Sequence, residues 1–159
     1  MKYLIIDSRE KPKATKKIIS YFDKIGVEHV SSKLLFGDYM DFNNPGVVVD
    51  RKQNIAELAK NCTWEHERFK SELARAKMAG STLVVLVEQD HYRDRGNLVE
   101  VKTIEDLMLW TSPYTTICGE KVFRVLSSWC SKYPLRVEFC NKNDTGKRIL
   151  EIIYGKHNA

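Results

Sequence analysis

Hydrophobic and polar residues along the chain change their spacing several times, which predicts alternating strands and helices. The first apolar run, 2–7, has strand length and ends at Asp7, and the segment around Pro12 marks a turn after it. From 15 to 25 the apolar residues recur at helical spacing, and Gly26 then ends the helix. Three β-type segments joined by turns follow and predict a meander: 27–36, 38–42 and 46–51.

The rest of the chain continues this alternation. Residues 64–79 form an amphipathic helical pattern that Gly80 closes. Residues 82–88 are almost continuously apolar, as expected for a strand covered on both faces. The remaining predictions are a short helix at 54–60, an exposed connection at 90–102, helices at 103–110, 121–133 and 145–154, and a strand at 135–139. This order predicts an α/β domain with a central mixed β-sheet flanked by α-helices.

Composition narrows the class of protein. The chain has 159 residues, which suits one ordinary domain with a single core, so we expect one domain over 1–159. Hydrophobic residues make up 43% and charged residues 30%, a balance typical of globular proteins and unlike that of disordered chains. The formal charge of +5 and a pI near 9.0 favour an anionic partner without identifying it.

Cysteines and histidines give no sign of a zinc site or a disulfide framework. The cysteines form no CxxC pair, and the histidines are scattered without helical pairing or a nearby cysteine. The chain shows neither a signal peptide nor an apolar stretch of membrane-spanning length. We therefore expect reduced thiols, no zinc, no membrane partner and a cytoplasmic location. The residues concerned are Cys62, Cys118, Cys130, Cys140, His29, His66, His91 and His157.

The candidate chemistry lies in a GD pair that ends at Asp38 and a DRK run that starts at Asp50. Side chains two apart on a strand share a face, so Asp50 and Lys52 project together while Arg51 points away. If the strands that carry Asp38 and Asp50 pair, two carboxylates and an ammonium converge on one cleft. Carboxylates suit Mg²⁺, which takes further oxygens from substrate phosphate and can activate a water molecule. Taken alone, such a pattern is more often a charged strand end beside a turn.

Four motifs in this order resemble the nuclease domain of the XPF family of structure-specific endonucleases. That family carries DxRE, then GD, then ERK, then a helix with an arginine. The matching segments here are Asp7-Ser8-Arg9-Glu10, Gly37-Asp38-Tyr39, Val49-Asp50-Arg51-Lys52 and Arg68-Phe69-x-x-Glu72. The resemblance also extends to the strands predicted at 83–88 and 133–137. Because the family belongs to the PD-(D/E)XK superfamily, the resemblance implies a restriction-endonuclease-like fold, DNA as the substrate, and dependence on Mg²⁺ or Mn²⁺.

Carried over position by position, the resemblance implies roles for the acidic residues and the lysine. Asp38 and Asp50 would bind the metal ion, and Lys52 would be the catalytic lysine. Asp7 and Glu10 would line the same cleft with their carboxylates near the metal, and Asp7 would take part in catalysis.

The resemblance also implies roles for three arginines. Arg9 and Arg68 would contact DNA phosphates, for which a planar guanidinium is well suited. Arg51 would contact DNA or, facing away from the metal, form a structural ion pair. Glu72, one helical turn after Arg68, is expected to pair with it or orient it. Without the resemblance, Arg9 and Arg68 could equally be ordinary solvated side chains.

Two departures from the family matter, the first for the geometry of the metal site and the second for the preferred DNA structure. Asp50 stands where the family usually has Glu, so its carboxylate is one methylene shorter. We also expect neither a helix-hairpin-helix module nor a helicase in this chain, and those parts help to select branched DNA in the family.

Aromatic and apolar residues outside these motifs are expected mainly in the core. Ring stacking on bases is the alternative for five of them: Trp64, Trp110, Trp129, Tyr92 and Tyr114. The two late helices are richer in apolar residues than one small core needs, which predicts a face for a homodimer or heterodimer. This face would include Leu107, Leu109, Trp110, Val122, Val125, Leu126 and Trp129.

Our first functional hypothesis is a Mg²⁺-dependent DNA endonuclease that acts on branched, flap or single-strand-containing DNA. The first alternative is a catalytically inactive nuclease-like module for DNA binding or dimerisation. The second is a restriction or resolvase type of PD-(D/E)XK nuclease. The joint presence of Asp7, Asp38, Asp50 and Lys52 favours an enzyme, and the DxRE segment favours the XPF type. No small-molecule substrate is expected.

Overall fold

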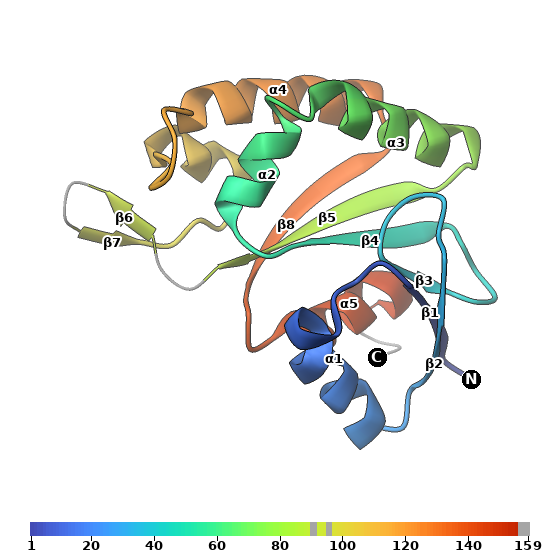
Figure 1. The fold of residues 1–159 in the computed structure, drawn as a ribbon. Coiled ribbons are helices and arrows are strands. Elements are labelled where there is room, and N and C mark those ends of the chain that lie inside the picture. Colours follow the sequence, from blue (N-terminus) through green and yellow to red (C-terminus); the bar gives the residue numbers. More distant parts are fainter. Residues whose placement is uncertain (90–91, 95–96, 156–159) are drawn as a thin grey trace.

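The computed structural model describes residues 1–89, 92–94 and 97–155 and has three layers, with a sheet between two layers of helices (Figure 1). The sheet has six strands in the order β2-β1-β3-β4-β5-β8. Their bounds are β1 Tyr3–Asp7, β2 Glu28–Ser32, β3 Tyr39–Asp41, β4 Val47–Lys52, β5 Thr82–Gln89 and β8 Leu135–Asn141. The predicted α/β class with a mixed central sheet is confirmed.

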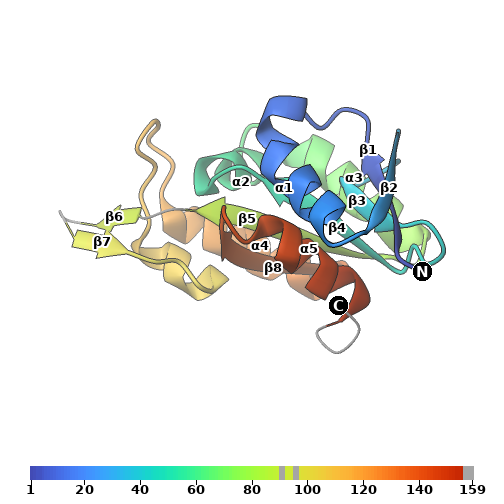
Figure 2. The ribbon, with the colours of Figure 1, turned by 90° about the horizontal axis from the view of Figure 1, so that it is seen from below.

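Five α-helices cover the two faces of this sheet. One face carries α2 (Ile55–Asn61), α3 (His66–Met78) and α4 (Gly119–Lys132), and the other carries α1 (Pro12–Lys24) and α5 (Thr145–Tyr154) (Figures 1 and 2). The predicted helices match these five within a few residues.

Strand β3 gives the sheet its mixed character. It runs antiparallel to both of its neighbours, β1 and β4, whereas every other neighbouring pair in this sheet is parallel. The carboxyl ends of β1 and β4 therefore lie at the same edge, together with the start of β3. In α/β sheets, binding sites commonly lie beyond the carboxyl ends of the strands.

Only the second half of the predicted meander is confirmed, because β3 pairs antiparallel with β4 but β2 does not pair with β3. Strand β2 pairs in parallel with β1, not with β3, because the chain leaves β1, passes through α1 and returns beside the strand it left. Such a strand–helix–strand unit has a parallel pair by construction. The position between β1 and β4 is then filled by β3.

Alternating side chains of the central strands supply two cores. On β4, Val48 packs on the α2–α3–α4 face and Val49 on the α1–α5 face. On β5, Leu83, Val85 and Val87 belong to the first core and Leu86 to the second. All six side chains are fully buried, which confirms that the apolar run at 82–88 is a strand covered on both faces.

Two further predictions are corrected between β5 and α4. The expected connection at 90–102 contains a two-stranded antiparallel pair, β6 (Tyr92–Asp94) and β7 (Asn97–Val99). Strands of three residues are too short to show a period in the sequence. The helix expected at 103–110 is a 3₁₀ helix, η1 (Ile104–Leu109), which begins with a capping box between Thr103 and Asp106.

Most of the apolar residues predicted for a dimer face are core residues instead. Leu107, Trp110, Val122, Leu126 and Trp129 are all buried, because η1 and α4 pack against one another as well as against the sheet. Among the predicted face residues, Leu109 is exposed, with 58% of its surface accessible. Dimerisation through these helices stays a prediction.

The remaining aromatic, histidine and cysteine predictions have mixed outcomes. Trp110 and Trp129 lie in the core as expected, but Trp64 and Tyr114 are exposed, and the side chain of Tyr92 lies outside the described part of the structure. His91 and His157 are also outside the described residues. All four cysteines are free thiols. Within 1–89, 92–94 and 97–155, none of the helices combines the length and the apolar character needed to cross a bilayer.

Candidate active site

A single pocket of about 280 Å³ gathers every residue of the predicted site. It lies where β1 and β4 end and β3 begins, with α3 forming one wall. The predicted residues that line it are Asp7, Arg9, Glu10, Asp38, Asp50, Arg51, Lys52, Arg68 and Glu72. Because the chain separates these residues by up to 65 positions, only the topology of the sheet brings them together.

Gly37 determines where Asp38 can lie. The backbone of Gly37 has a φ of 71°, a left-handed conformation that residues with a Cβ rarely adopt. A Cβ at this position would also lie 2.3 Å from Val48 Cγ1 and 3.2 Å from the carbonyl oxygen of Val49. The close approach lets the backbone N–H of Asp38 donate to that carbonyl at 2.7 Å, which holds Asp38 against β4.

The Asp38 carboxylate faces the strand that carries the other predicted ligand. Its Oδ2 accepts a hydrogen bond from the backbone N–H of Arg51 at 2.8 Å. Burial raises the pKa of Asp38 well above its ordinary value, and the charges of Asp50 and Glu10 together with a hydrogen bond to the Asp50 side chain raise it further. Two acidic side chains are thus held side by side in a site that resists a double negative charge.

Asp50 and Lys52 project to the same side of β4, as the strand period predicts. Lys52 Nζ lies 2.9 Å from Asp50 Oδ2, and both side chains are about nine-tenths buried or more. Burial lowers the pKa of Lys52, but the charges of Asp50 and Asp38 outweigh it and leave the pKa raised. The ammonium also lies over the ring of Phe69, 5.4 Å from its centre, so Lys52 is held as a cation from two sides.

A divalent cation suits this pair of carboxylates. Asp50 Oδ2 is fully enclosed and meets no donor in hydrogen-bonding geometry, so its contact with Lys52 is an ion pair only. A cation bound to Asp50 Oδ2 would give this oxygen a partner. It would also relieve the repulsion between carboxylates that raises the pKa of Asp38. The described residues contain no group of three or more His, Cys, Asp or Glu side chains placed to hold a metal ion. Two adjacent carboxylates are nevertheless a donor set that fits Mg²⁺, which is commonly bound by one or two carboxylates with water and phosphate completing its shell.

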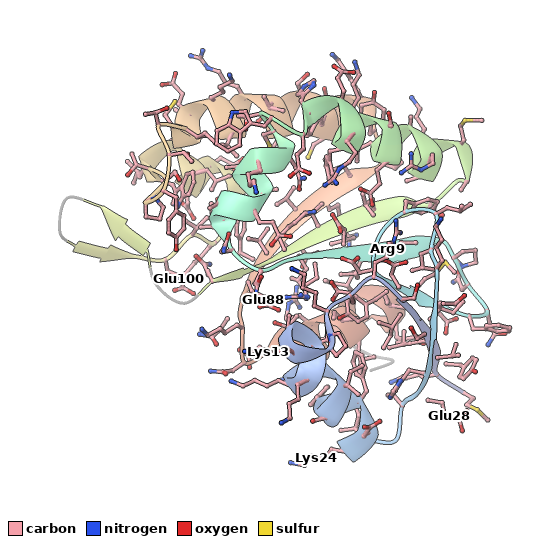
Figure 3. All side chains as sticks on the ribbon, in the orientation of Figure 1. Arg9, Lys13, Lys24, Glu28, Glu88 and Glu100 are labelled. Carbon is pink, nitrogen blue, oxygen red and sulfur yellow. The ribbon has the colours of Figure 1, made fainter. Side chains whose placement is uncertain are left out.

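Asp7 lies in the pocket but is engaged by protein groups. Arg9 Nε donates to Asp7 Oδ2 at 2.8 Å, and Oδ1 accepts from Arg9 Nη2 at 3.2 Å and from the backbone N–H of Leu34 at 2.8 Å. Arg9 Nη2 also donates to the carbonyl of Leu34. Asp7 therefore fixes Arg9 and the loop after β2 at the rim of the pocket, while 61% of the Arg9 side chain remains exposed. Figure 3 shows Arg9 at this rim.

Glu10 and Arg51 belong to a buried network behind the pocket. Arg51 Nε donates to Glu10 Oε2 at 2.9 Å and Arg51 Nη1 donates to Glu88 Oε1 at 3.1 Å. The hydroxyl of Tyr39 donates to the same Glu10 oxygen at 2.8 Å. Only 6% of the Arg51 side chain is exposed, so the structure places Arg51 in internal ion pairs rather than on a surface that DNA could reach.

Arg68 and Glu72 do not form the pair expected from their spacing. Arg68 forms an ion pair with Glu65, and three-quarters of its side chain is exposed. Glu72 Oε1 instead accepts the backbone N–H of Gly37 at 2.7 Å. Burial raises the pKa of Glu72, as does the charge of Asp50, while the hydrogen bond from Gly37 lowers it. Glu72 therefore anchors the Gly37 turn to α3, and Arg68 is left to reach outward.

Comparison with protein-family models decides the relationship. The model of the ERCC4 domain matches residues 6–149, which is most of the chain and includes all the residues of the pocket. The chain belongs to the ERCC4 domain family. The resemblance seen in its four motifs is thereby confirmed.

Solved structures show that this ERCC4 domain has the fold of XPF. The XPF structure from Aeropyrum pernix superposes with a TM-score of 0.65 at 16% identity, covering 94% of this chain and 62% of that chain. A structure of XPF from Aeropyrum pernix in complex with DNA gives a TM-score of 0.63 at 16% identity, covering 96% and 63%. This chain therefore spans less than two thirds of those proteins. A search of curated proteins found no match.

Several residues of the pocket were not predicted from the ERCC4 motifs. Glu57 and Arg75 also line it, and Arg75 Nε donates to the carbonyl of Leu35 at 3.0 Å. The network behind it includes Glu88 and Tyr39. The sequence could have indicated a role for Glu88, since an acidic residue at the end of an apolar strand must find a partner when it is buried.

Proposed function

We propose that this ERCC4 domain is a metal-dependent DNA endonuclease. The proposal depends on one observation, the adjacent Asp38 and Asp50 carboxylates with the Lys52 ammonium beside them in a single pocket. The chain therefore presents anionic ligands and a cation at the place where a phosphodiester could dock. The family and the DNA complex of a related structure support the same conclusion.

Asp38 and Asp50 would hold the divalent ion through carboxylate oxygens. When bound, Mg²⁺ or Mn²⁺ supplies positive charge that stabilises the phosphoryl transition state and lowers the pKa of a bound water. The raised pKa of Asp38 disfavours its charged form, and a bound cation would favour that form.

Lys52 would act through its charge. Its raised pKa keeps it protonated at neutral pH, so it does not serve as a base in the resting protein. It would instead stabilise the nucleophile or the negative charge that develops on the phosphate oxygens. Arg9 and Arg68, both largely exposed at the rim, would bind the neighbouring phosphates and orient the strand.

We further propose branched, flap or other single-strand-containing DNA as the substrate. This part rests on family membership and on a pocket with basic residues at its rim. Repair and recombination are the processes in which such DNA occurs.

The deciding experiment is cleavage of labelled duplex, single-stranded, flap and four-way DNA with Mg²⁺, Mn²⁺ or EDTA. We expect cutting only with the divalent ions. Asp38→Asn and Lys52→Met should each lower the rate by about 100-fold or more, the usual cost of losing one group that stabilises the transition state. Asp23→Asn removes an exposed carboxylate in the last part of α1 and should leave the rate unchanged. Metal-independent cutting, or cutting that survives both site variants, would refute the proposal.

A further inference from the structure

A second pocket of about 510 Å³ adjoins the candidate active site. The two pockets share four wall residues, Arg9, Glu10, Arg51 and Glu57, so they are neighbouring parts of one surface depression. Its volume lies within the range of about 300–1,000 Å³ that is typical of ligand sites. The mechanism proposed above makes no use of it.

Cationic side chains give this second pocket affinity for phosphate. Lys11, just before α1, and Lys60, in the last turn of α2, are exposed. Neither forms an ion pair within the part of the chain that the structure describes, and Arg9 also lines the pocket from the shared wall. Three acids also line the wall, but Glu10 is paired with Arg51, Glu57 accepts a backbone hydrogen bond from Gln53 at 3.0 Å and Glu65 is paired with Arg68.

Tyr114 supplies an aromatic side chain to the lining of the same pocket. It lies in the loop between η1 and α4, and 78% of it is exposed. The loop is shaped by two hydrogen bonds from the backbone N–H groups of Tyr114 and Thr115 to the hydroxyl of Ser112, each at 3.2 Å, and by a bridge between Thr111 and Cys118. In Figure 2 this loop, drawn in orange before α4, projects on the same side of the molecule as α2 and the start of α1.

Lysines and an exposed aromatic ring that line one pocket are a combination suited to binding single-stranded nucleic acid. Cationic groups follow the backbone, and successive bases stack on aromatic side chains regardless of sequence. A paired base in duplex DNA has both faces covered by its neighbours, so Tyr114 could stack only on a base that is unpaired. Gln53 and Asn54, which also line the pocket, add polar groups that suit a hydrated strand.

We propose that the second pocket binds the single-stranded part of the DNA substrate next to the scissile phosphate, with a base stacked on Tyr114 and phosphates on Lys11 and Lys60. This inference rests on the proposed function. It adds a feature that selects DNA at a junction between duplex and single strand, because the duplex side lacks a base that can enter.

Binding measured in EDTA tests the pocket without any cleavage. The probes are a short fluorescent oligothymidylate and a labelled fully paired duplex of two strands, and binding is followed by fluorescence anisotropy. We expect Tyr114→Ala to weaken binding of the oligothymidylate by about five- to tenfold or more, in line with the loss of one stacked base, with no matching change on the duplex. Tyr114→Phe should bind as the parent does, because the ring remains.

Lysine variants give an independent measurement. Lys60→Ala should weaken oligothymidylate binding and lower the slope of log affinity against log salt by roughly 0.7, the value for one phosphate contact on a single strand. Lys24→Ala, at the far end of α1 from the pocket (Figure 3), should change neither quantity. Tyr114 and Lys60 are exposed, so thermal unfolding should be unchanged and rule out misfolding.

Replacing one thymine by 2-aminopurine reports stacking directly. Its fluorescence should be quenched on binding and recover with Tyr114→Ala. If Tyr114→Ala left the affinity for the oligothymidylate unchanged, or weakened binding of duplex and single strand equally, the proposed role of the second pocket would be wrong. The nuclease proposal would remain intact. Selective binding that depends on Tyr114 in a protein that cuts no DNA with Mg²⁺ would overturn the nuclease proposal instead.

Discussion

At the residue scale, the geometry of the candidate site depends on a few residues that hold the pocket groups in place. Gly37 permits the turn that brings Asp38 to β4, and Glu72 holds that turn by accepting the Gly37 N–H. Arg51, in the wall of the pocket, ties β4 to Glu10 and Glu88 through buried ion pairs. The pocket groups are thus positioned by residues that would not themselves touch DNA.

Gly37→Ala should destabilise the protein more than the same change at Gly26. Both glycines have φ values above 70°, so each substitution should cost about 1–2 kcal/mol in backbone strain. Only at Gly37 does the new Cβ collide with Val48 and β4, whereas Gly26 has nothing within 4 Å. Urea unfolding measures both. Equal losses at the two positions would show that the close approach to β4 carries no cost.

Arg51→Met should lower the free energy of unfolding by about 3–5 kcal/mol, because two buried carboxylates lose their partner. The matched control is Arg124→Met. Arg124 forms a surface ion pair with Glu120, and both are largely exposed, so its loss should cost about 1 kcal/mol or less. Similar values for the two variants in chemical denaturation would contradict the structural role of Arg51.

At the element scale, local hydrogen bonds decide where η1 begins. The 3₁₀ helix η1 starts at a capping box in which Asp106 accepts the backbone N–H groups of Lys102 and Thr103 at 2.9 and 3.1 Å. These hydrogen bonds lower the pKa of Asp106. The element continues into the loop that carries Tyr114, so its start also sets one wall of the second pocket.

Asp106→Ala should destabilise the protein by about 1 kcal/mol at pH 7, as the loss of a cap does. The pKa of Asp106 is lower in the folded than in the unfolded protein. The stabilisation of the folded protein by the Asp106 carboxylate is therefore fully present above the unfolded pKa of about 3.9. It disappears as pH falls through the folded pKa. Chemical denaturation of the variant and the parent, at pH 7 and at a pH below the folded pKa of Asp106, measures this difference in the free energy of unfolding. Glu105→Ala, one residue before, should show no such pH-dependent difference; if it does, the cap is not the cause.

At the scale of the whole molecule, the sheet joins two cores into one unit. Leu126 is buried in the core under α4, and Ile149 is buried in the core under α5. The same strands β4 and β5 contribute side chains to both. The carboxyl ends of β1 and β4, which carry the candidate site, lie between the two layers.

Leu126→Ala and Ile149→Ala should each cost about 2–5 kcal/mol, since both side chains are fully buried. Because the cores share the sheet, each variant should shift one common unfolding transition rather than split it. Calorimetry together with near- and far-UV circular dichroism tests this. Two separated transitions would show that the helical layers unfold independently.

Much of this protein was determined by local sequence. The periods of apolar residues predicted all five α-helices and the buried strand β5, because such periods reflect which face of each element meets a core. The i, i+2 spacing placed Asp50 and Lys52 together on β4, and the four motifs identified the family. In contrast, the three-residue strands β6 and β7 left no period to detect, and the parallel pairing of β2 with β1 depended on the path through α1.

Only the tertiary structure decided the partners of the charged groups. Arg51 lies 41 residues from Glu10 and 37 from Glu88, and neither contact leaves a trace in local spacing. The same holds for Glu72, whose neighbour in the sequence is Arg68 but whose partner is Gly37. Buried polar groups take whichever partner the packing of distant elements delivers, since leaving them unpaired costs more than any local preference. Sequence thus determined the elements and the family, and packing determined which side chains meet.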